Sequence, residues 1–128
     1  MVAPFDLKTI RRIDAVLHEP SRLCIAFALN MSDVLSFSEL KALLGMTDGN
    51  LSVHLRTLEE KGYVATHRTT DAGKPRKLCR LSGRGRTAFK EYLAILDQIL
   101  LAARVTANGG GPSPGGGGPR GGTLAKEA

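Results

Sequence analysis

One stretch constrains the fold more than any other: residues 36–60 predict two short amphipathic helices separated by only a few residues. In SFSELKALLG, Ser36 and Glu39 have the spacing of a capping box, in which each side chain satisfies an otherwise unpaired backbone N–H. Gly45 suits the left-handed cap that ends such a helix, and Thr47 suits the cap that begins the next one. Two helices joined by so short a glycine-containing turn form a helix-turn-helix.

The second helix of the pair, in TDGNLSVHLRTLEEKGYV, has two unlike faces. Leu51, Leu55 and Leu58 recur at i, i+4 and i+7, so they share the face that meets a core. The other side carries hydrogen-bonding residues where Lys or Glu would meet water with better helix propensity. These residues are Asn50, Ser52, His54 and Arg56. In a helix-turn-helix the second helix enters the major groove of DNA, and its N-terminal residues reach base edges.

The expected roles of these side chains follow from the chemistry of the groove. Gly49 allows the backbone to approach the bases, Asn50 can pair with adenine and Arg56 with guanine. Ser52 can bond a base or a phosphate, and Val53 can touch a thymine methyl group. Each also has a purely structural interpretation, in which the polar residues are ordinary helix surface and His54 packs against Leu58 and donates one hydrogen bond.

Three elements are predicted before this pair. Apolar spacing indicates a helix over residues 6–17, and Pro20 suits the first turn of a second helix over 20–30. The side chains expected to face the core from that second helix are Leu23, Phe27 and Cys24. The short apolar run at 35–37 is a candidate strand.

A hairpin is predicted after the pair. Residues 63–70 and 76–81 are typical strands, and DAGKP at 71–75 has turn chemistry. Because two strands alone are marginal in water, the run at 35–37 is expected to be their third partner. The basic hairpin is interpreted as a wing whose Arg68, Lys74 and Arg76 contact phosphates or the minor groove.

A long helix over 83–105, capped by Ser82, ends the folded part. It has two apolar stripes, although a helix against a single core needs only one. We therefore expect a homodimer built largely on this helix. The expected dimer contacts are Phe89, Tyr92, Leu93, Leu96, Ile99 and Leu100. The alternative is that the chain's own small core uses both stripes.

The fold class that results is mainly α with a small β-wing (α+β), a winged helix-turn-helix with a long C-terminal dimerisation helix. It occupies residues 1–105 as one DNA-binding and dimerisation domain. Residues 106–128 hold nine of the fifteen glycines, so we expect a disordered Gly/Pro-rich tail there.

Charge and composition narrow the function. The formal net charge is +6, and residues 47–86 carry nine basic against four acidic side chains, which is the footprint of a polyanion partner. With so few aromatic residues, 5%, RNA stacking is disfavoured. No catalytic constellation, cofactor motif or metal-ligand spacing is visible, so we expect no enzyme activity, no cofactor and no metal site.

Cellular context is predicted in the same way. No apolar run is long enough to span a membrane and no secretory signal is visible, so a cytoplasmic protein without a membrane partner is expected. The two cysteines, Cys24 and Cys79, are too few for a disulfide framework and are interpreted as buried side chains, with a redox-sensing pair as the alternative.

Three segments carry a family resemblance: LHEPSRLCIAFAL, FSELKALLGMTDGNLSVHLRTLEEKGYV and KPRKLCRLSGRGRTAFKEYL. They resemble the winged-helix transcriptional regulators of the MarR/ArsR-like group, and TDGNLSxHL and GRxAF are typical of one small subfamily. The resemblance implies a dimeric DNA-binding repressor or regulator. Its recognition helix would span 47–57, which adds Thr47, Asp48 and His54 to the contact residues, and its wing would span 66–77. Gly83-Arg84 departs from the Pro-Glu that the family often has.

The sequence therefore predicts a sequence-specific, double-stranded-DNA-binding regulator, acting as a repressor and as a homodimer on a pseudo-palindromic operator. A small-molecule effector is compatible with this reading but nothing in the sequence indicates one. The alternative function is a winged-helix protein-interaction module with only nonspecific affinity for nucleic acid.

Overall fold

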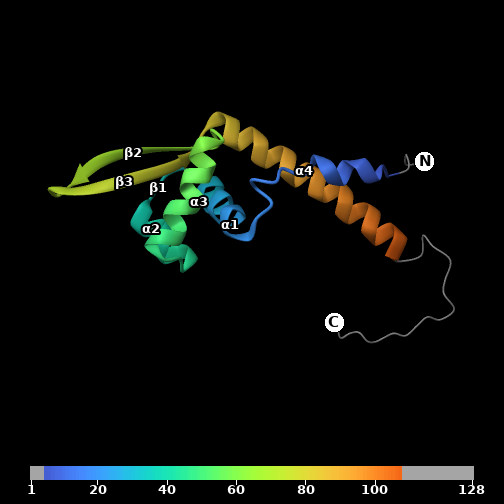
Figure 1. Ribbon diagram of the computed structural model, residues 1–128, viewed down its shortest axis with the longest axis horizontal. Coiled ribbons are helices and arrows are strands. Elements are labelled where there is room, and N and C mark those ends of the chain that lie inside the picture. Colours follow the sequence, from blue (N-terminus) through green and yellow to red (C-terminus); the bar gives the residue numbers. More distant parts are fainter. Residues whose placement is uncertain (1–4, 108–128) are drawn as a thin grey trace.

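The computed structural model describes residues 5–107 and confirms the predicted winged helix-turn-helix (Figure 1). Its elements are a 3₁₀ helix η1 (Leu7–Arg12), α1 (Pro20–Met31), β1 (Leu35–Ser36), α2 (Phe37–Leu44), α3 (Asp48–Glu60), β2 (Val64–Asp71), β3 (Lys74–Leu81) and α4 (Gly83–Val105). Helices α1, α2 and α3 form a lobe. The β2–β3 hairpin extends from one side of it, and α4 extends from the other side.

The helix-turn-helix forms as its capping residues predict. Ser36 Oγ accepts a hydrogen bond from the Glu39 backbone N–H at 3.0 Å, and Glu39 accepts one from the Ser36 N–H at 2.8 Å. Gly45 ends α2 with a left-handed φ of 65°. Thr47 Oγ1 accepts from the Asn50 N–H at 3.1 Å and so begins α3. These local bonds fix where the second helix starts.

The sheet has the order β1-β3-β2 and is antiparallel throughout. The hairpin turn is tighter than the five residues expected, because Ala72 and Gly73 alone connect the strands. Both have positive φ, 53° and 79°, which is the geometry that matches the right-handed twist of a two-residue hairpin. β1 pairs Leu35 with Cys79, so the predicted third strand is confirmed, although Phe37 already belongs to α2.

The core lies between α1, α2, α3 and the base of the hairpin. Leu51, Leu55 and Leu58 of α3 are fully buried, as their spacing predicts. The predicted core face of α1 was wrong for Cys24, which is exposed, and for Phe27, which is 44% exposed, whereas Leu23 is half-buried and packs against the core. The face that is buried consists of Ile25, Ala26, Ala28 and Leu29. Because Ala26 and Ala28 have small side chains, α1 and α3 can pack closely together.

The predicted α-helix over 6–17 was also wrong. The six-residue 3₁₀ helix η1 ends at Arg12, and Asp14 then turns the chain by accepting the N–H groups of Val16 and Leu17 at 2.9 and 3.2 Å. A carboxylate that binds its own backbone two and three residues ahead competes with helical bonding. Leu17 is still buried, whereas Leu7 is 74% exposed.

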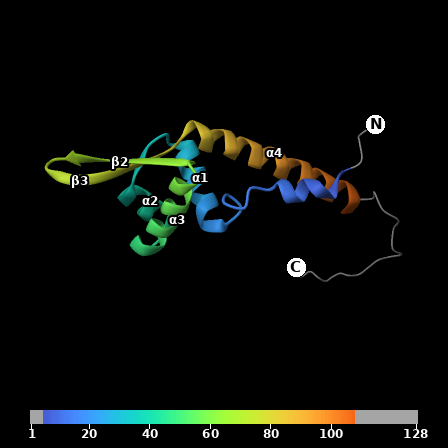
Figure 2. The same ribbon diagram turned by 45° about the horizontal axis from the view of Figure 1, so that its top comes forward.

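The long helix α4 begins at Ser82, whose Oγ accepts from the Gly85 N–H at 2.9 Å. Phe89 and Tyr92 are each 1% exposed and pack within this chain's core, so their assignment to a dimer contact was wrong. The Tyr92 hydroxyl lies 2.8 Å from His18 Nδ1. Figure 2 shows that α4 continues well beyond the lobe, with η1 alongside it, as in Figure 1.

The outer half of α4 exposes large apolar side chains. Among the described residues these are Leu93, Leu100, Leu101 and Val105, which are 37%, 48%, 57% and 58% exposed, while Leu96 and Ile99 are half-buried. Within residues 5–107 no helix is long and apolar enough to cross a membrane. The predicted tail falls outside the described residues from position 108 onward.

Candidate nucleic-acid interface

The free face of α3 is a stripe of four residues: Gly49, Asn50, Val53 and Arg56. All four are exposed, and they repeat at the helical spacing i, i+1, i+4 and i+7. Val53 is 57% exposed although it is apolar and sits beside a well-formed core. The stripe thus combines an amide, a guanidinium and a small apolar group around a glycine, which is a set that can address base edges.

Three of the other four residues predicted on the recognition helix have partners within the chain. The Thr47 hydroxyl caps α3, and the Asp48 carboxylate lies 2.8 Å from Lys41 Nζ. His54 turns toward α1, where its Nδ1 lies 3.2 Å from Arg22 Nη1 and 3.8 Å from Glu19 Oε1. The interpretation of His54 as packing against Leu58 and donating one hydrogen bond did not identify these partners on another helix.

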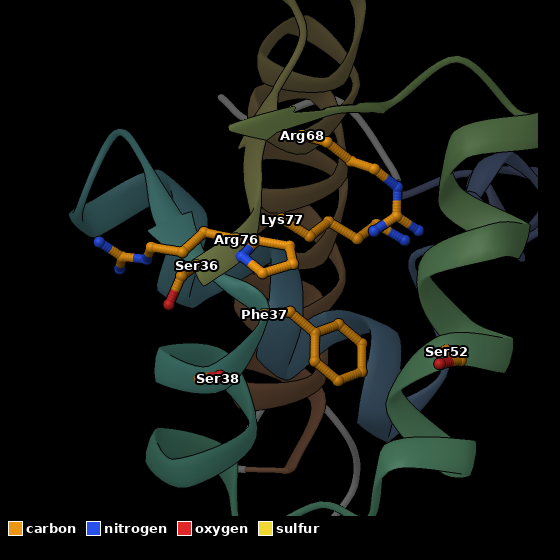
Figure 3. Close-up of a pocket in the computed structure, with 8 residues that line it drawn as sticks. Ser36, Phe37, Ser38, Ser52, Arg68, Arg76 and Lys77 are labelled. Carbon is orange, nitrogen blue, oxygen red and sulfur yellow. The ribbon is translucent and has the colours of Figure 1, made fainter. Parts of the chain in front are cut away.

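Ser52 is half-buried and faces the wing. It lines a pocket of about 340 Å³ that opens between α2, α3 and the hairpin (Figure 3). The lining residues are Ser36, Phe37, Ser38, Ser52, Arg68, Pro75, Arg76 and Lys77. Three of the eight are cationic and three carry hydroxyl groups, so the pocket is suited to an anion.

The three predicted wing residues have different surroundings. Lys74 is exposed at the start of β3, next to the hairpin turn. Arg76 is already paired, 3.1 Å from Asp71 and 3.7 Å from Glu39. The Ser36 backbone N–H and hydroxyl, together with Arg76, hold the pKa of Glu39 below its ordinary value, so this carboxylate stays charged. Arg68 lines the pocket.

Of the three cations that line the pocket, Lys77 is the one absent from the predicted wing contacts. It lies directly opposite Arg68 in the hairpin register, and therefore on the same face of the sheet. The two-residue turn at 72–73 sets that register. With the expected five-residue turn the two strands would pair in a different register, and Arg68 would not lie opposite Lys77. The sequence therefore did not indicate that these two cations are neighbours.

The cysteines and the candidate metal ligands add nothing to this interface. Burial raises the pKa of the Cys79 thiol to about 11, and its side chain is fully buried, whereas Cys24 is exposed. The expectation that both cysteines are buried was thus wrong for Cys24. Across the described part of the chain, no three His, Cys, Asp or Glu side chains gather to hold a metal ion.

Known proteins share this architecture. A transcriptional regulator homologue from Pyrococcus horikoshii OT3 superposes with a TM-score of 0.72 at 28% identity, covering 76% of this chain and 98% of that one. Wild-type MarR from E. coli in its apo form gives a TM-score of 0.60 at 16% identity, covering 82% and 87%. An uncharacterised protein of Methanocaldococcus jannaschii is 42% identical over 63 residues, which is 49% of this chain and 68% of that protein.

The remaining comparison is with family models, and one matches most of the folded part. It spans residues 21–100, from the start of α1 to the outer part of α4, and is described as a winged helix DNA-binding domain. Those residues include the helix-turn-helix, the whole hairpin and the pocket between them. The chain belongs to the winged helix DNA-binding domain family.

Proposed function

We propose that this protein is a sequence-specific transcriptional regulator that binds double-stranded DNA as a homodimer and acts as a repressor by occupying a pseudo-palindromic operator. The observation that carries the proposal is the exposed stripe on α3, which lies beside a basic wing. A solubilising surface would be served as well by Lys and Glu, which are better helix formers than Gly or Asn. A protein-docking wing would not need this stripe.

The stripe suggests a division of labour within α3. Asn50 reads adenine and Arg56 reads guanine through two hydrogen bonds each, and Val53 contacts a thymine methyl group. Gly49 keeps the N-terminal end of α3 free of a side chain that would hold the backbone away from the bases. His54 acts indirectly, because its contacts with Arg22 and Glu19 orient α3 on α1. Lys74 contributes a phosphate contact without sequence preference.

The homodimer is inferred from the outer half of α4. Leu93 and Leu100 are 37% and 48% exposed there, on a helix segment that has no lobe of its own chain to cover it. A second copy with the same exposed helix would bury both apolar faces at once, which is the self-complementary contact of a twofold dimer. The corrected dimer contacts are therefore Leu93, Leu96, Ile99 and Leu100, without Phe89 and Tyr92.

DNA selection tests the reading of bases. Duplexes are selected from a randomised pool, and binding of the winner is followed by fluorescence anisotropy for the wild type, Asn50→Ala, Arg56→Ala and Lys74→Ala. A palindromic consensus is expected. The two α3 variants should each lose about 1–3 kcal/mol on it and little on random duplex. Lys74→Ala should weaken both duplexes alike. Absence of enrichment, or equal losses for all three variants on both duplexes, would leave a protein-interaction module as the better reading.

Sedimentation equilibrium tests the dimer separately. Leu100→Glu should shift the protein toward monomer, because it places a charge on the surface that the second copy covers. Gln98→Glu is the matched control, since it adds the same charge two residues earlier, on roughly the opposite side of α4. Equal dissociation constants for the two variants would contradict this dimer.

A further inference from the structure

Two cations face each other across the wing. Arg68 of β2 is directly opposite Lys77 of β3, and like charges in this position destabilise a sheet. Cys79 is fully buried on the same face of β3, so the pair lies on the side of the hairpin that continues into the core. Among the residues that the structure describes, neither cation lies within 4 Å of an acidic side chain, the cut-off for an ion pair.

The pair is held in place despite this repulsion. Lys77 Nζ lies 5.9 Å from the centroid of the Phe37 ring, within range of a cation–π interaction. Figure 3 shows Arg68 and Lys77 extending together toward α3, where Ser52 faces the pocket, while Arg76 extends the other way. Since Arg76 lies near Asp71 and Glu39, its charge is already offset inside the chain. The positive charge that remains uncompensated is therefore concentrated on the α3 side of the pocket.

We propose that Arg68 and Lys77, with the Ser52 hydroxyl, form a binding site for one phosphate group. The arrangement supplies what a phosphate requires: a planar guanidinium, a compact ammonium and a hydroxyl donor around one opening of about 340 Å³. An anion between the two cations would replace their repulsion by two attractions. The repulsion between Arg68 and Lys77 therefore slightly destabilises the free wing, and the bound anion relieves it.

The source of that phosphate is the DNA backbone, and this part of the inference rests on the proposed function. The site joins β2 and β3 of the wing to α3, so a single backbone phosphate would contact the wing and the recognition helix at once. Phosphate contacts set the register of a protein on the duplex. The site would fix how deep and at what angle Gly49 and Asn50 enter the groove.

Salt-dependent binding to a short mixed-sequence duplex tests the backbone phosphate. Arg68→Gln, Lys77→Gln and the double variant are compared with Arg80→Gln, which loses the same charge from the opposite face of β3. Because both cations hold one phosphate, the double variant should lower the slope of log K against log salt by about 0.9, the value for a single phosphate. A loss of about 1.8 would mean two separate phosphates, and a loss no larger than that of Arg80→Gln would mean none. Either result overturns the shared site.

Inorganic phosphate tests the pocket without DNA. Amide resonances of the wild-type protein are followed as sodium phosphate replaces sodium chloride at constant ionic strength. The signals of Ser38, Ser52, Arg68 and Lys77 should shift and saturate, and those of Ser38 and Ser52 should stay fixed in the double variant. Thermal unfolding of the variants at or above the wild-type temperature would show that the wing is intact, because the substitutions remove a repulsion.

The two arms separate the outcomes. Saturable shifts with an unchanged salt slope would assign the pocket to a free phosphate-bearing ligand and overturn the backbone assignment. If no amide of the pocket responds to phosphate, the site itself is refuted. If the wild type binds no duplex, the proposed function fails, and the phosphate titration still decides whether the pocket binds the anion.

Discussion

The contact between α4 and the start of the hairpin yields the sharpest stability prediction. A Cβ placed on Gly85 would lie 2.0 Å from the carbonyl oxygen of Tyr63 and 2.9 Å from its carbonyl carbon. Both are backbone atoms, and that oxygen also accepts a hydrogen bond from the Ser82 N–H at 2.9 Å. The neighbour cannot turn aside as a flexible side chain would, so Gly85→Ala must displace α4 from the hairpin or break this bond.

The expected cost can be worked out from the parts. Overpacking costs about 1–3 kcal/mol, the lost hydrogen bond about 1 kcal/mol, and replacing glycine in a helix returns about 1 kcal/mol. Gly85→Ala should therefore lower the free energy of unfolding by roughly 1–3 kcal/mol. For a folded part of this size that corresponds to a fall in Tm of about 5–20 °C.

Urea denaturation followed by circular dichroism measures this difference, and the chain offers a matched control. Gly83 lies two residues earlier in the same helix, and a Cβ there would have no atom within 4 Å. Gly83→Ala should leave stability unchanged or raise it by up to about 1 kcal/mol. If the two variants unfold within about 0.5 kcal/mol of each other, the reasoning from backbone contact is refuted.

Three further predictions rest on separate features. Gly49→Ala should not destabilise the free protein, since a Cβ there meets nothing within 4 Å, yet it should weaken DNA binding at least about tenfold in anisotropy; unchanged affinity would contradict the close approach of α3. Burial and the hydrogen bond to Asp14 raise the pKa of Tyr63 to about 12, so its contribution to stability is fully present below about pH 10 and is lost as the pH rises toward 12. Urea unfolding across that window should show Tyr63→Phe losing about 2 kcal/mol less than the wild type, and parallel curves would refute it. A chromogenic disulfide reagent should react quickly with exposed Cys24 and only at the unfolding rate with buried Cys79, whereas two fast equivalents would contradict the burial of Cys79.

The parts of the fold that sequence could predict are those fixed by neighbours in the chain. Ser36, Gly45, Thr47 and Ser82 satisfy backbone groups within a few residues of themselves, so the ends of α2, the start of α3 and the start of α4 follow from short patterns. The three leucines of α3 are buried for a similarly local reason, because helical spacing alone places them on one side.

The errors arose where a distant residue decides the outcome. Asp14 ends the N-terminal helix early, and its carboxylate also accepts the hydroxyl hydrogen bond of Tyr63, far along the chain. On α1, apolar size favoured Phe27 as a core residue, but close packing selects the alanine side, and Phe27 instead meets Phe89 edge to face at 5.1 Å between ring centroids. Neither preference is visible without the partner.

The candidate interface divides in the same way. The stripe on α3 could be predicted because it is one helix face. The pocket could not, because it needs α2, α3 and both strands of the hairpin, and it depends on a register that a two-residue turn imposes. His54 shows the same limit: the family resemblance placed it among the DNA contacts, and the sequence gives no sign of Arg22 and Glu19, which lie 32 and 35 positions earlier and hold it against α1.

The length of α4 gives the proposed dimer a mechanical property. Its 23 residues make a rod roughly 34 Å long at 1.5 Å per residue, anchored to the lobe at Gly85 and exposed at its far end. If residues 93–100 are fixed to a second copy, about 17 Å along α4 from Gly85, a tilt of about 11° would move the lobe by about 3.4 Å, the rise of a single base pair along DNA. The spacing of two recognition helices would then be adjustable in steps of one base pair by small rotations at the dimer contact. A regulator of this design could lose its operator without any change in the residues that read it.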